Sequence, residues 1–261
     1  MIIVKAPEEI AALRRACQAA AEVLAQVAAQ VVPGATTEEL DQFAAARMRE
    51  LGASSAFLGY HGYPGHICVS INEEVVHGLP SKRKIRYGDV VSLDVGVSLD
   101  GWIGDNAVTV AVGMVDPGVQ ALLAATEAAL RAGVAQARAG NAVGDISHAV
   151  EECVTQRGFS VVREYVGHGV GRTMHEEPQI PNYGLAGHGP RLRAGMTLAI
   201  EPMVNLGTGA VRTLGDHWTV VTADGKPAAH FEHTVLVTEA EPEILTCWEG
   251  KPYGLKARSR P

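Results

Sequence analysis

The feature that most constrains the fold of this chain is a repeat in the order of its predicted elements. Each half reads as two helices with apolar residues at helical spacing, followed by three short apolar strands. In the first half these elements lie at residues 6–31, 38–51, 66–71, 90–97 and 107–112. After Pro117 they return at residues 117–139, 143–157, 160–166, 197–204 and 234–238. We therefore predict a single domain, residues 1–261, built from two related α/β halves at about 6–116 and 117–250.

The repeat extends to acidic residues in the predicted strands. A turn glycine is followed six positions later by Asp94 in the first half and by Glu201 in the second. A second pairing matches Asp105 with Glu232, each at the start of another apolar run. Each half is therefore predicted to place two carboxylates at equivalent positions.

Four carboxylates converging from apolar strands predict a metal site. A buried carboxylate without a partner costs several kcal/mol, and neighbouring carboxylates raise one another's pKa. The nearby strands supply no Lys or Arg at matching positions, so we expect two divalent cations, which bridging carboxylates hold about 3.5–4 Å apart in two-metal hydrolases. His168, flanked by glycines, is the expected fifth ligand. Oxygen ligands with one nitrogen suit Mn, Fe(II), Co or Zn.

A single acid of this set also has an ordinary structural interpretation. Asp105 could cap a turn after Gly104, and Asp94 could pair with an arginine. The repeated set of four acids together with His168 favours the metal site, because chance does not place acids at equivalent strand positions twice.

Seven short motifs follow one another along essentially the whole chain. They are Asn72-Glu-Glu-Val-Val-His77-Gly-Leu-Pro, Leu93-Asp94-Val, Gly104-Asp105, Gly167-His168-Gly-Val-Gly171, Met174-His175-Glu-Glu-Pro178, Ile200-Glu201-Pro and Phe231-Glu232-His-Thr. In this order they resemble the type I methionine aminopeptidases. The resemblance implies the α/β (α+β) pita-bread fold of the creatinases and aminopeptidases, in which two pseudo-symmetric halves form a curved, antiparallel-rich sheet backed by helices.

The resemblance also assigns the metal ligands residue by residue. It implies that Asp94, Asp105 and Glu232 hold one metal ion, and that Asp105, His168, Glu201 and Glu232 hold the other. Asp105 and Glu232 would bridge the two ions. Both ions would be divalent, with Co, Mn, Fe(II) and Zn as candidates.

Three residues are expected to act in the reaction itself. The resemblance makes His77 and His175 substrate-contacting residues. Glu201, beside the attacking water, is the best candidate to accept its proton and pass it to the leaving amine. His175 can donate to the developing oxyanion, and His77 would contact the scissile amide nitrogen or the leaving amine.

The side chain of the substrate's methionine is expected to lie in a soft, aromatic pocket, because sulfur–aromatic contacts are favourable. By analogy with the family, its lining is Phe57, Tyr60, Tyr63, Cys68, Met174 and Trp218. Each of these could instead be an ordinary core residue. Phe57 is larger than the residue expected there in some relatives. The histidines without a motif are expected to be surface or packing residues: His66, His148, His188, His217 and His230.

The predicted activity is hydrolytic removal of the N-terminal methionine from nascent proteins whose second residue is small. One alternative is another pita-bread peptidase of the prolidase or aminopeptidase P type. Those usually carry an additional N-terminal domain, whereas here the repeat begins near residue 6. The other alternative is a catalytically inactive relative that binds peptide or RNA. Such a protein is expected to have lost ligands, and this chain has all five.

Charge and cysteine usage narrow the partners and the compartment. The net charge is −7, which argues against DNA or RNA as a partner, because nucleic-acid binding needs clustered Lys and Arg. The short basic tail of Lys256, Arg258 and Arg260 is expected to be a solvated terminus. We expect no membrane span and no signal peptide. Four scattered cysteines indicate reduced thiols and a cytoplasmic location. We expect a monomer, and the nascent substrate makes the ribosome a candidate partner.

Overall fold

The helices begin and end close to the residues that the sequence pattern indicates. The computed structural model describes residues 2–248 and 251–252, so the basic tail at residues 256–260 lies outside the described residues. The α-helices are α1 (Pro7–Ala29), α2 (Thr37–Glu50), α3 (Pro117–Ala135) and α4 (Val143–Thr155). A capping box opens α2: the Thr36 hydroxyl accepts from the backbone of Glu39 at 3.2 Å, and the Glu39 carboxylate accepts from the backbone of Thr36 at 2.7 Å. None of the described helices is long and apolar enough to cross a membrane.

Most strands are short, and two long strands lie at the centre of the molecule. The first half holds β1 (Ser54–Ser55), the 3-10 helix η1 (Tyr60–Gly62), β2 (Cys68–Ile71), β3 (Glu74–Val76), β4 (Val90–Leu99) and β5 (Trp102–Ala111). The second half holds β6 (Ser160–Val161), β7 (Gly167–Gly169), β8 (Glu176–Ile180), β9 (Thr197–Ile200), β10 (Met203–Asn205), β11 (Val211–Thr213), β12 (Val220–Thr222), β13 (Ala228–His230), β14 (Glu232–Leu236), β15 (Glu243–Ile244), β16 (Cys247–Trp248) and β17 (Lys251–Pro252).

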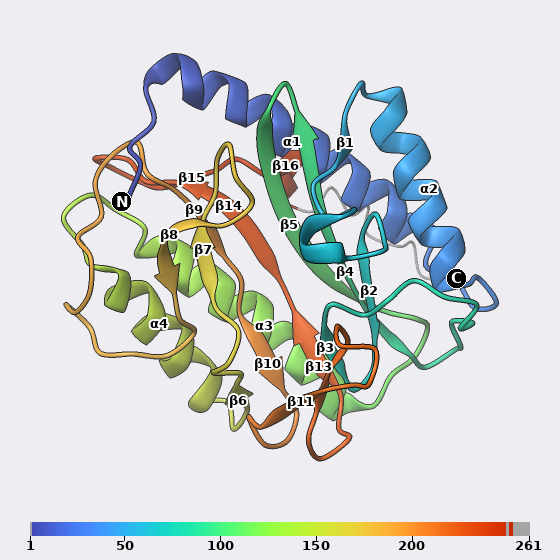
Figure 1. Ribbon diagram of the computed structural model, residues 1–261. Coiled ribbons are helices and arrows are strands. Elements are labelled where there is room, and N and C mark those ends of the chain that lie inside the picture. The colour runs from blue at the N-terminus through green and yellow to red at the C-terminus, as the bar shows by residue number, and fades with distance from the viewer. Residues whose placement is uncertain (1, 249–250, 253–261) are drawn as a thin grey trace.

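The main sheet joins strands from both halves of the chain. Its order is β1-β4-β5-β14-β9-β7-β8, with β2 also paired to β4 and β15 to β14. β4 and β5 form one antiparallel pair, β9 and β14 form another, and the two pairs meet where Glu232 lies opposite Ala107 (Figure 1). The predicted antiparallel-rich sheet is therefore confirmed. The two pairs also support the proposed division into related halves.

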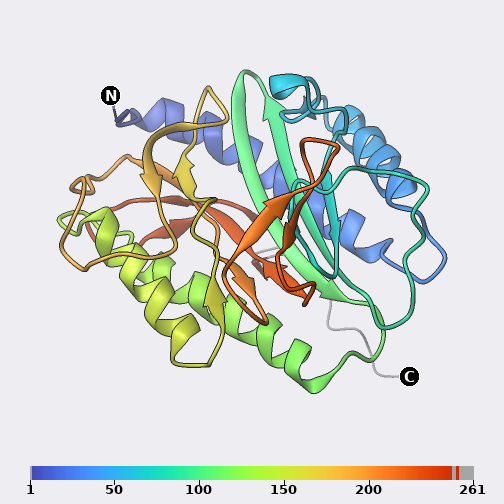
Figure 2. The same ribbon diagram turned by 60° about the horizontal axis from the view of Figure 1, so that its bottom comes forward.

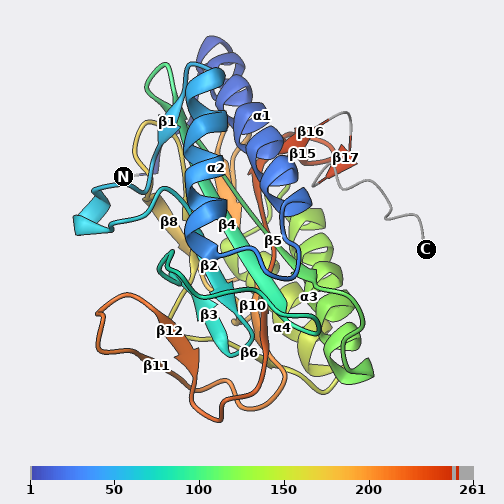
Figure 3. The ribbon, with the colours of Figure 1, turned by 90° about the vertical axis from the view of Figure 1, so that its right-hand side faces the viewer.

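The long helices pack on the sheet in corresponding ways. α1 contacts β4 and β5, and α3 contacts β9 and β14. Figure 2 shows the blue helices α1 and α2 along one part of the sheet and the green helices α3 and α4 along the other, and Figure 3 shows the small sheet of β3, β11 and β12 on the side away from α1 and α3. A Cβ on Gly104 would lie 2.5 Å from Cα of Cys17, so only glycine lets α1 approach β5 this closely beside Asp105.

Three predicted strands differ most in extent from those observed. The run at 160–166 is strand only at β6, and its remainder turns toward the main cavity, where Tyr165 and Val166 line the wall. The run at 197–204 is divided into β9 and β10 at Pro202, which lacks the backbone N–H that a continuous ladder needs. β5 begins at Trp102, so Asp105 lies inside the strand rather than before it.

Candidate metal centre and substrate pocket

Neighbouring strands of the main sheet bring the predicted ligands together. Asp94 lies in β4, Asp105 in β5 and Glu232 at the start of β14, and these three strands are adjacent in the sheet. Glu201 directly follows β9, the next strand, and His168 lies in β7 beside it. Residues far apart in sequence therefore reach one place because their strands are hydrogen-bonded neighbours.

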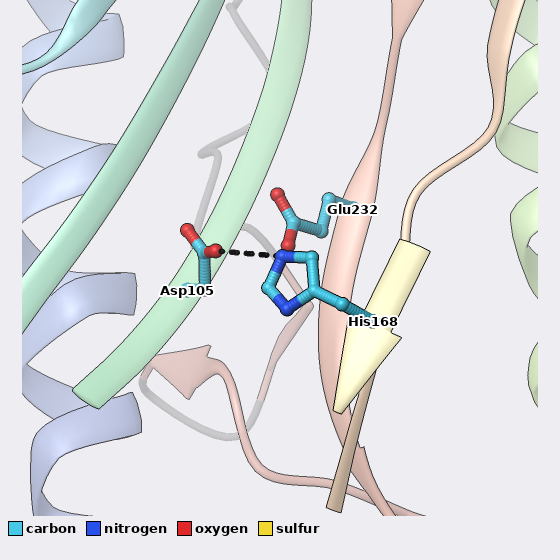
Figure 4. A group of neighbouring side chains, drawn as sticks. All are labelled: Asp105, His168 and Glu232. Carbon is cyan, nitrogen blue, oxygen red and sulfur yellow. Dashed lines mark ion pairs between the residues drawn. The ribbon is translucent and has the colours of Figure 1, made fainter. Parts of the chain in front are cut away.

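The distances between donor atoms fit a shared cation. One ligand atom from each of Asp105, His168 and Glu232 lies within 4.8 Å of the other two, and Figure 4 shows the three side chains pointing toward one another. Nε2 of His168 is 3.7 Å from Oδ2 of Asp105 and 3.4 Å from Oε1 of Glu201. Donors that each bind a transition metal at about 2.0–2.2 Å lie roughly 3–4 Å apart. The cluster thus has the dimensions of a metal-ligand set.

Several oxygens in this cluster are buried without a hydrogen-bond partner among the described residues. They are Oδ1 of Asp94, Oδ1 of Asp105 and Oε1 of Glu232. An unpaired buried carboxylate oxygen is costly, and native structures contain few such atoms without a functional explanation. Divalent cations bound among these carboxylates would give such oxygens the partners that they lack.

Burial and mutual repulsion disfavour the ionised acids. Burial raises the pKa of Asp94 to about 7. Burial, then the charges of neighbouring acids, raise the pKa values of Asp105, Glu201 and Glu232 well above their ordinary range. In the same place, burial lowers the pKa of His168 to about 3, which keeps the imidazole neutral and able to bind a metal.

The residues present fit divalent cations better than any other partner. No Lys or Arg is among the described residues that line the cavity around the acids. Two divalent ions would balance the four negative charges. Four carboxylates and one imidazole form an oxygen-rich set of the kind that Mn, Fe(II), Co or Zn accept.

The glycines around His168 serve the packing of its strand. A Cβ on Gly167 would lie 2.4 Å from the carbonyl oxygen of Ala199, and a Cβ on Gly169 would lie 2.4 Å from that of Glu177. Only glycine at these positions lets β7 lie this close to its neighbours β9 and β8.

The two predicted catalytic histidines lie on the wall of the same cavity. The His175 ring centroid is 4.2 Å from that of His168. His77 directly follows β3 with a φ of 59°, a left-handed conformation that non-glycine residues seldom adopt and that is concentrated at functional sites. Burial lowers the pKa of both histidines, that of His77 to about 4, so both rings are neutral near pH 7.

The predicted methionine pocket adjoins the acids in one cavity of about 250 Å³. All the predicted site residues line this cavity: Phe57, Tyr60, Tyr63, Cys68, His77, Asp94, Asp105, His168, Met174, His175, Glu201, Trp218 and Glu232. Its apolar part is one packed cluster, in which the Tyr63 ring lies 5.0 Å from Trp218 and 6.4 Å from Phe57, both edge to face. Ligand pockets usually measure about 300–1,000 Å³. This cavity is suited to a single side chain.

Two further residues of the site were not singled out in the sequence. His230, expected to be a surface or packing residue, is buried, and in addition its Nε2 lies 3.7 Å from Oε2 of Glu201. Strand alternation was the available signal, because His230 is two positions before Glu232 and residues i and i+2 share a face. Tyr165 also lines the cavity, with its ring 5.5 Å from that of His77.

A curved sheet with acids converging from both halves onto one imidazole, beside a pocket for a single side chain, defines a pita-bread metallohydrolase. The model of metallopeptidase family M24 matches residues 11–239. Methionine aminopeptidase 1 of Bacillus subtilis is 49% identical over 246 residues, which cover 94% of this chain and 99% of that protein. The chain belongs to metallopeptidase family M24, and within it to the methionine aminopeptidases.

Solved structures agree with this placement. The crystal structure of methionine aminopeptidase from Thermotoga maritima matches with a TM-score of 0.93 and 48% identity, covering 94% of this chain and 99% of that one. Prolidase from Pyrococcus furiosus matches with a TM-score of 0.76 and 23% identity, covering 94% of this chain and 65% of that one. At this low identity, the likeness to the prolidase shows only that the two proteins have the same fold. Together the two structures confirm the predicted pita-bread architecture.

Proposed function

We propose that this chain hydrolyses the peptide bond after an N-terminal methionine, with a preference for substrates whose second residue is small. The observation that carries the proposal is that one cavity joins the acid cluster to an apolar, sulfur- and aromatic-lined pocket. A methionine side chain in the pocket would place its own carbonyl carbon beside the acids. Nascent polypeptides, which begin with methionine, are the natural substrate class.

Five residues would hold two divalent metal ions. Asp94, Asp105 and Glu232 would bind one, and Asp105, His168, Glu201 and Glu232 the other, with Asp105 and Glu232 as bridges. The unpartnered oxygens of Asp94, Asp105 and Glu232 support this assignment. When bound, the two ions would lower the pKa of a shared water and polarise the scissile carbonyl.

The placement of Asp94 would explain why only an N-terminal residue is removed. Asp94 is partly exposed at the cavity, although its Oδ1 is buried and unpartnered. A free α-amino group would bind on this side of the cluster, while the side chain enters the pocket. An internal residue of a polypeptide has no free α-amino group that could bind beside Asp94.

Glu201 would move the proton during the reaction. It would accept a proton from the attacking water and return it to the amine that leaves. Its carboxylate is almost buried, with 13% of the side chain exposed, and lies within 3.4 Å of His168. This position beside the ligand cluster is the one that the role requires.

Two neutral histidines would act on the substrate. His175 would donate its Nε2–H to the developing oxyanion, a type of contact worth roughly 100- to 1,000-fold in kcat at comparable sites. His77 would contact the scissile nitrogen from the side of the cavity formed by Tyr165 and Trp218, whose rings lie 5.5 Å and 6.4 Å from its own.

We also propose a cytoplasmic location. The four cysteines, Cys17, Cys68, Cys153 and Cys247, are all free thiols, as expected in a reducing compartment. A monomeric state remains a prediction, as does contact with the ribosome, which is expected because the proposed substrate is a nascent chain.

Peptide hydrolysis with and without metal tests the proposal. Purified protein is treated with a chelator, and Mn or Co is then restored against a Met-Ala-Ser peptide, a Met-Leu-Ser peptide and an Ala-Pro peptide. We expect cleavage of Met-Ala only, lost on chelation and regained with about two ions bound per chain. Preferential cleavage of Ala-Pro would favour a prolidase-type enzyme. Inactivity with every metal would indicate a catalytically inactive relative.

A further inference from the structure

Lys5 and Glu176 form a buried ion pair behind the loop that carries His175. Nζ of Lys5 lies 2.6 Å from Oε2 of Glu176, and the side chains are only 3% and 5% exposed. Lysine is almost never buried this completely unless it is paired, and the cost of desolvating both charges makes such a pair a poor source of stability. Its position in the molecule therefore calls for an explanation other than stability.

The same carboxylate closes the loop between β7 and β8. The second oxygen of Glu176 accepts the backbone N–H of Arg172 at 3.0 Å. A Cβ on Gly171 would lie 2.5 Å from this oxygen and 2.9 Å from Cε of Lys5, so the two side chains fill the space beneath the loop. At its start the loop is tied to β5, because the carbonyl of Gly171 accepts from the backbone of Ile103 at 2.8 Å. The carboxylate therefore holds the end of the loop that carries His175.

The N-terminal arm that supplies Lys5 is itself held in place. The backbone N–H of Lys5 donates to the carbonyl of Gly195 at 2.9 Å, in the turn before β9. A Cβ on Gly195 would lie 2.8 Å from Cγ1 of Val4, so the arm lies directly against this turn. β9 leads to Glu201. Lys5 thus bonds through its main chain to the turn that leads to Glu201, and through its side chain to the loop that carries His175.

We propose that Lys5 is a positioning residue for His175, acting through Glu176. This inference rests on the proposed function, in which His175 donates to the oxyanion. Glu176 directly follows His175, so the ion pair fixes the backbone from which the imidazole projects. The His175 side chain is exposed as well as lining the cavity, and the contacts that hold its ring come from Tyr60 and His168, whereas its backbone is held from the Glu176 side. A donor that must meet a developing charge loses much of its effect when it is displaced by about 1 Å.

A double-mutant cycle separates this role from a general contribution to folding. Lys5→Met, which removes the ammonium, is made in the native chain and in a His175→Ala background, with Lys5→Arg as the conservative variant. The matched control is Arg14→Met, which breaks the ion pair of Arg14 with Glu243 at 2.9 Å between α1 and β15. Kinetics are measured on the metal-loaded enzyme at a temperature where circular dichroism shows every variant folded.

We expect Lys5→Met to lower kcat about tenfold with little change in KM, as loss of part of a transition-state contact does. In the His175→Ala background the same change should have almost no further effect on kcat. Lys5→Arg should recover most of the loss, and Arg14→Met should leave kcat unchanged. If Lys5→Met does not fold, Glu176→Gln takes its place in the cycle with the same expected non-additivity.

One result would contradict the positioning role of Lys5, and another would contradict the role of His175 in the proposed function. An equal fall in kcat from Lys5→Met in both backgrounds would overturn the positioning role, because the effect would not pass through His175. If His175→Ala itself leaves kcat unchanged, the role of His175 in the proposed function fails instead. As a measurement independent of activity, amide hydrogen exchange at residues 171–176 should speed up in Lys5→Met and not in Arg14→Met.

Discussion

The hydroxyl oxygen of Tyr60 lies 2.6 Å from Nδ1 of His175. Burial lowers the pKa of His175, so the ring is neutral near pH 7 and carries one proton. If the Tyr60 hydroxyl donates to Nδ1, the ring proton resides on Nε2. Tyr60, assigned to the methionine pocket from the sequence, is therefore placed where donation from its hydroxyl would select the tautomer that the proposed oxyanion contact needs.

Tyr60→Phe should lower kcat about fivefold and change KM little, because a neutral hydrogen bond contributes roughly 1 kcal/mol. The phenyl ring remains, so the pocket keeps its apolar wall. Steady-state kinetics on a Met-Ala-Ser peptide measure the effect. Tyr63→Phe is the control, since the Tyr63 hydroxyl donates to the carbonyls of Ile67 and Gly78 at 3.1 and 3.0 Å. Tyr63→Phe should lower the stability of the protein and leave kcat unchanged. A fall in kcat for Tyr63→Phe with none for Tyr60→Phe would contradict the role assigned to Tyr60.

Asp105→Asn and Glu201→Gln should each abolish turnover while the protein stays folded. The native-state pKa of Asp105 is raised by burial and by neighbouring acids, so in the metal-free protein its ionisation opposes folding above its ordinary pKa. Metal-free Asp105→Asn should therefore melt at the same temperature as the parent chain or higher at pH 7.5. Mn should raise the Tm of the parent far more than that of the variant. Near-normal activity in both variants would refute the ligand assignment.

Phe57→Leu should relax the selectivity for methionine. Phe57 packs over Gly96, where a Cβ would lie 2.4 Å from its ring, so the aromatic ring is held at the pocket wall. A smaller side chain leaves space for a bulkier substrate residue, and pocket changes of this size alter discrimination by about 1–3 kcal/mol. The ratio of kcat/KM for methionine to that for an N-terminal phenylalanine should fall about tenfold or more. Gly96→Ala, which pushes the ring inward, should instead lower methionine cleavage, and an unchanged ratio in Phe57→Leu would place the ring outside the pocket.

His77→Gln should remove part of the acid sensitivity of folding. Burial lowers the pKa of His77 from 6.5 to about 4. Between these values the unfolded chain binds the proton and the folded chain does not, so the stability contributed by neutral His77 is full above pH 6.5 and is lost as the pH falls toward 4. Urea unfolding of metal-free protein at several pH values should show a shallower decline for His77→Gln than for the parent. Parallel curves would mean that His77 is solvated in the folded state.

The chemistry of the candidate metal site could be predicted from the sequence because the residues proposed as its ligands lie in short local patterns. Asp94 and Glu201 follow a turn glycine at the same spacing, and Asp105 and Glu232 open equivalent apolar runs. An acid in an apolar strand is unusual, since burial opposes its charge. Repetition of that unusual feature in both halves, with seven family motifs, also determined the fold class and the order of helices.

The first and last residues of each strand were harder to predict from the sequence, because hydrogen-bonded partners rather than residue types decide where a strand starts. β5 begins at Trp102 since residues 102–111 pair along their whole length with β4. Pro202 ends the ladder that the apolar pattern alone would have continued to residue 204.

The sequence by itself determined which residue types could bind metal and which half each came from, because ligand chemistry and strand periodicity are local properties. Only the tertiary structure decided which groups meet. Tyr60 and His175 are 115 positions apart, and Lys5 and Glu176 are 171 apart. His230 reaches Glu201 only because β13 and β14 bring it beside the end of β9. No local pattern encodes such contacts, since they depend on how strands pair and on the space that glycines leave for close approach.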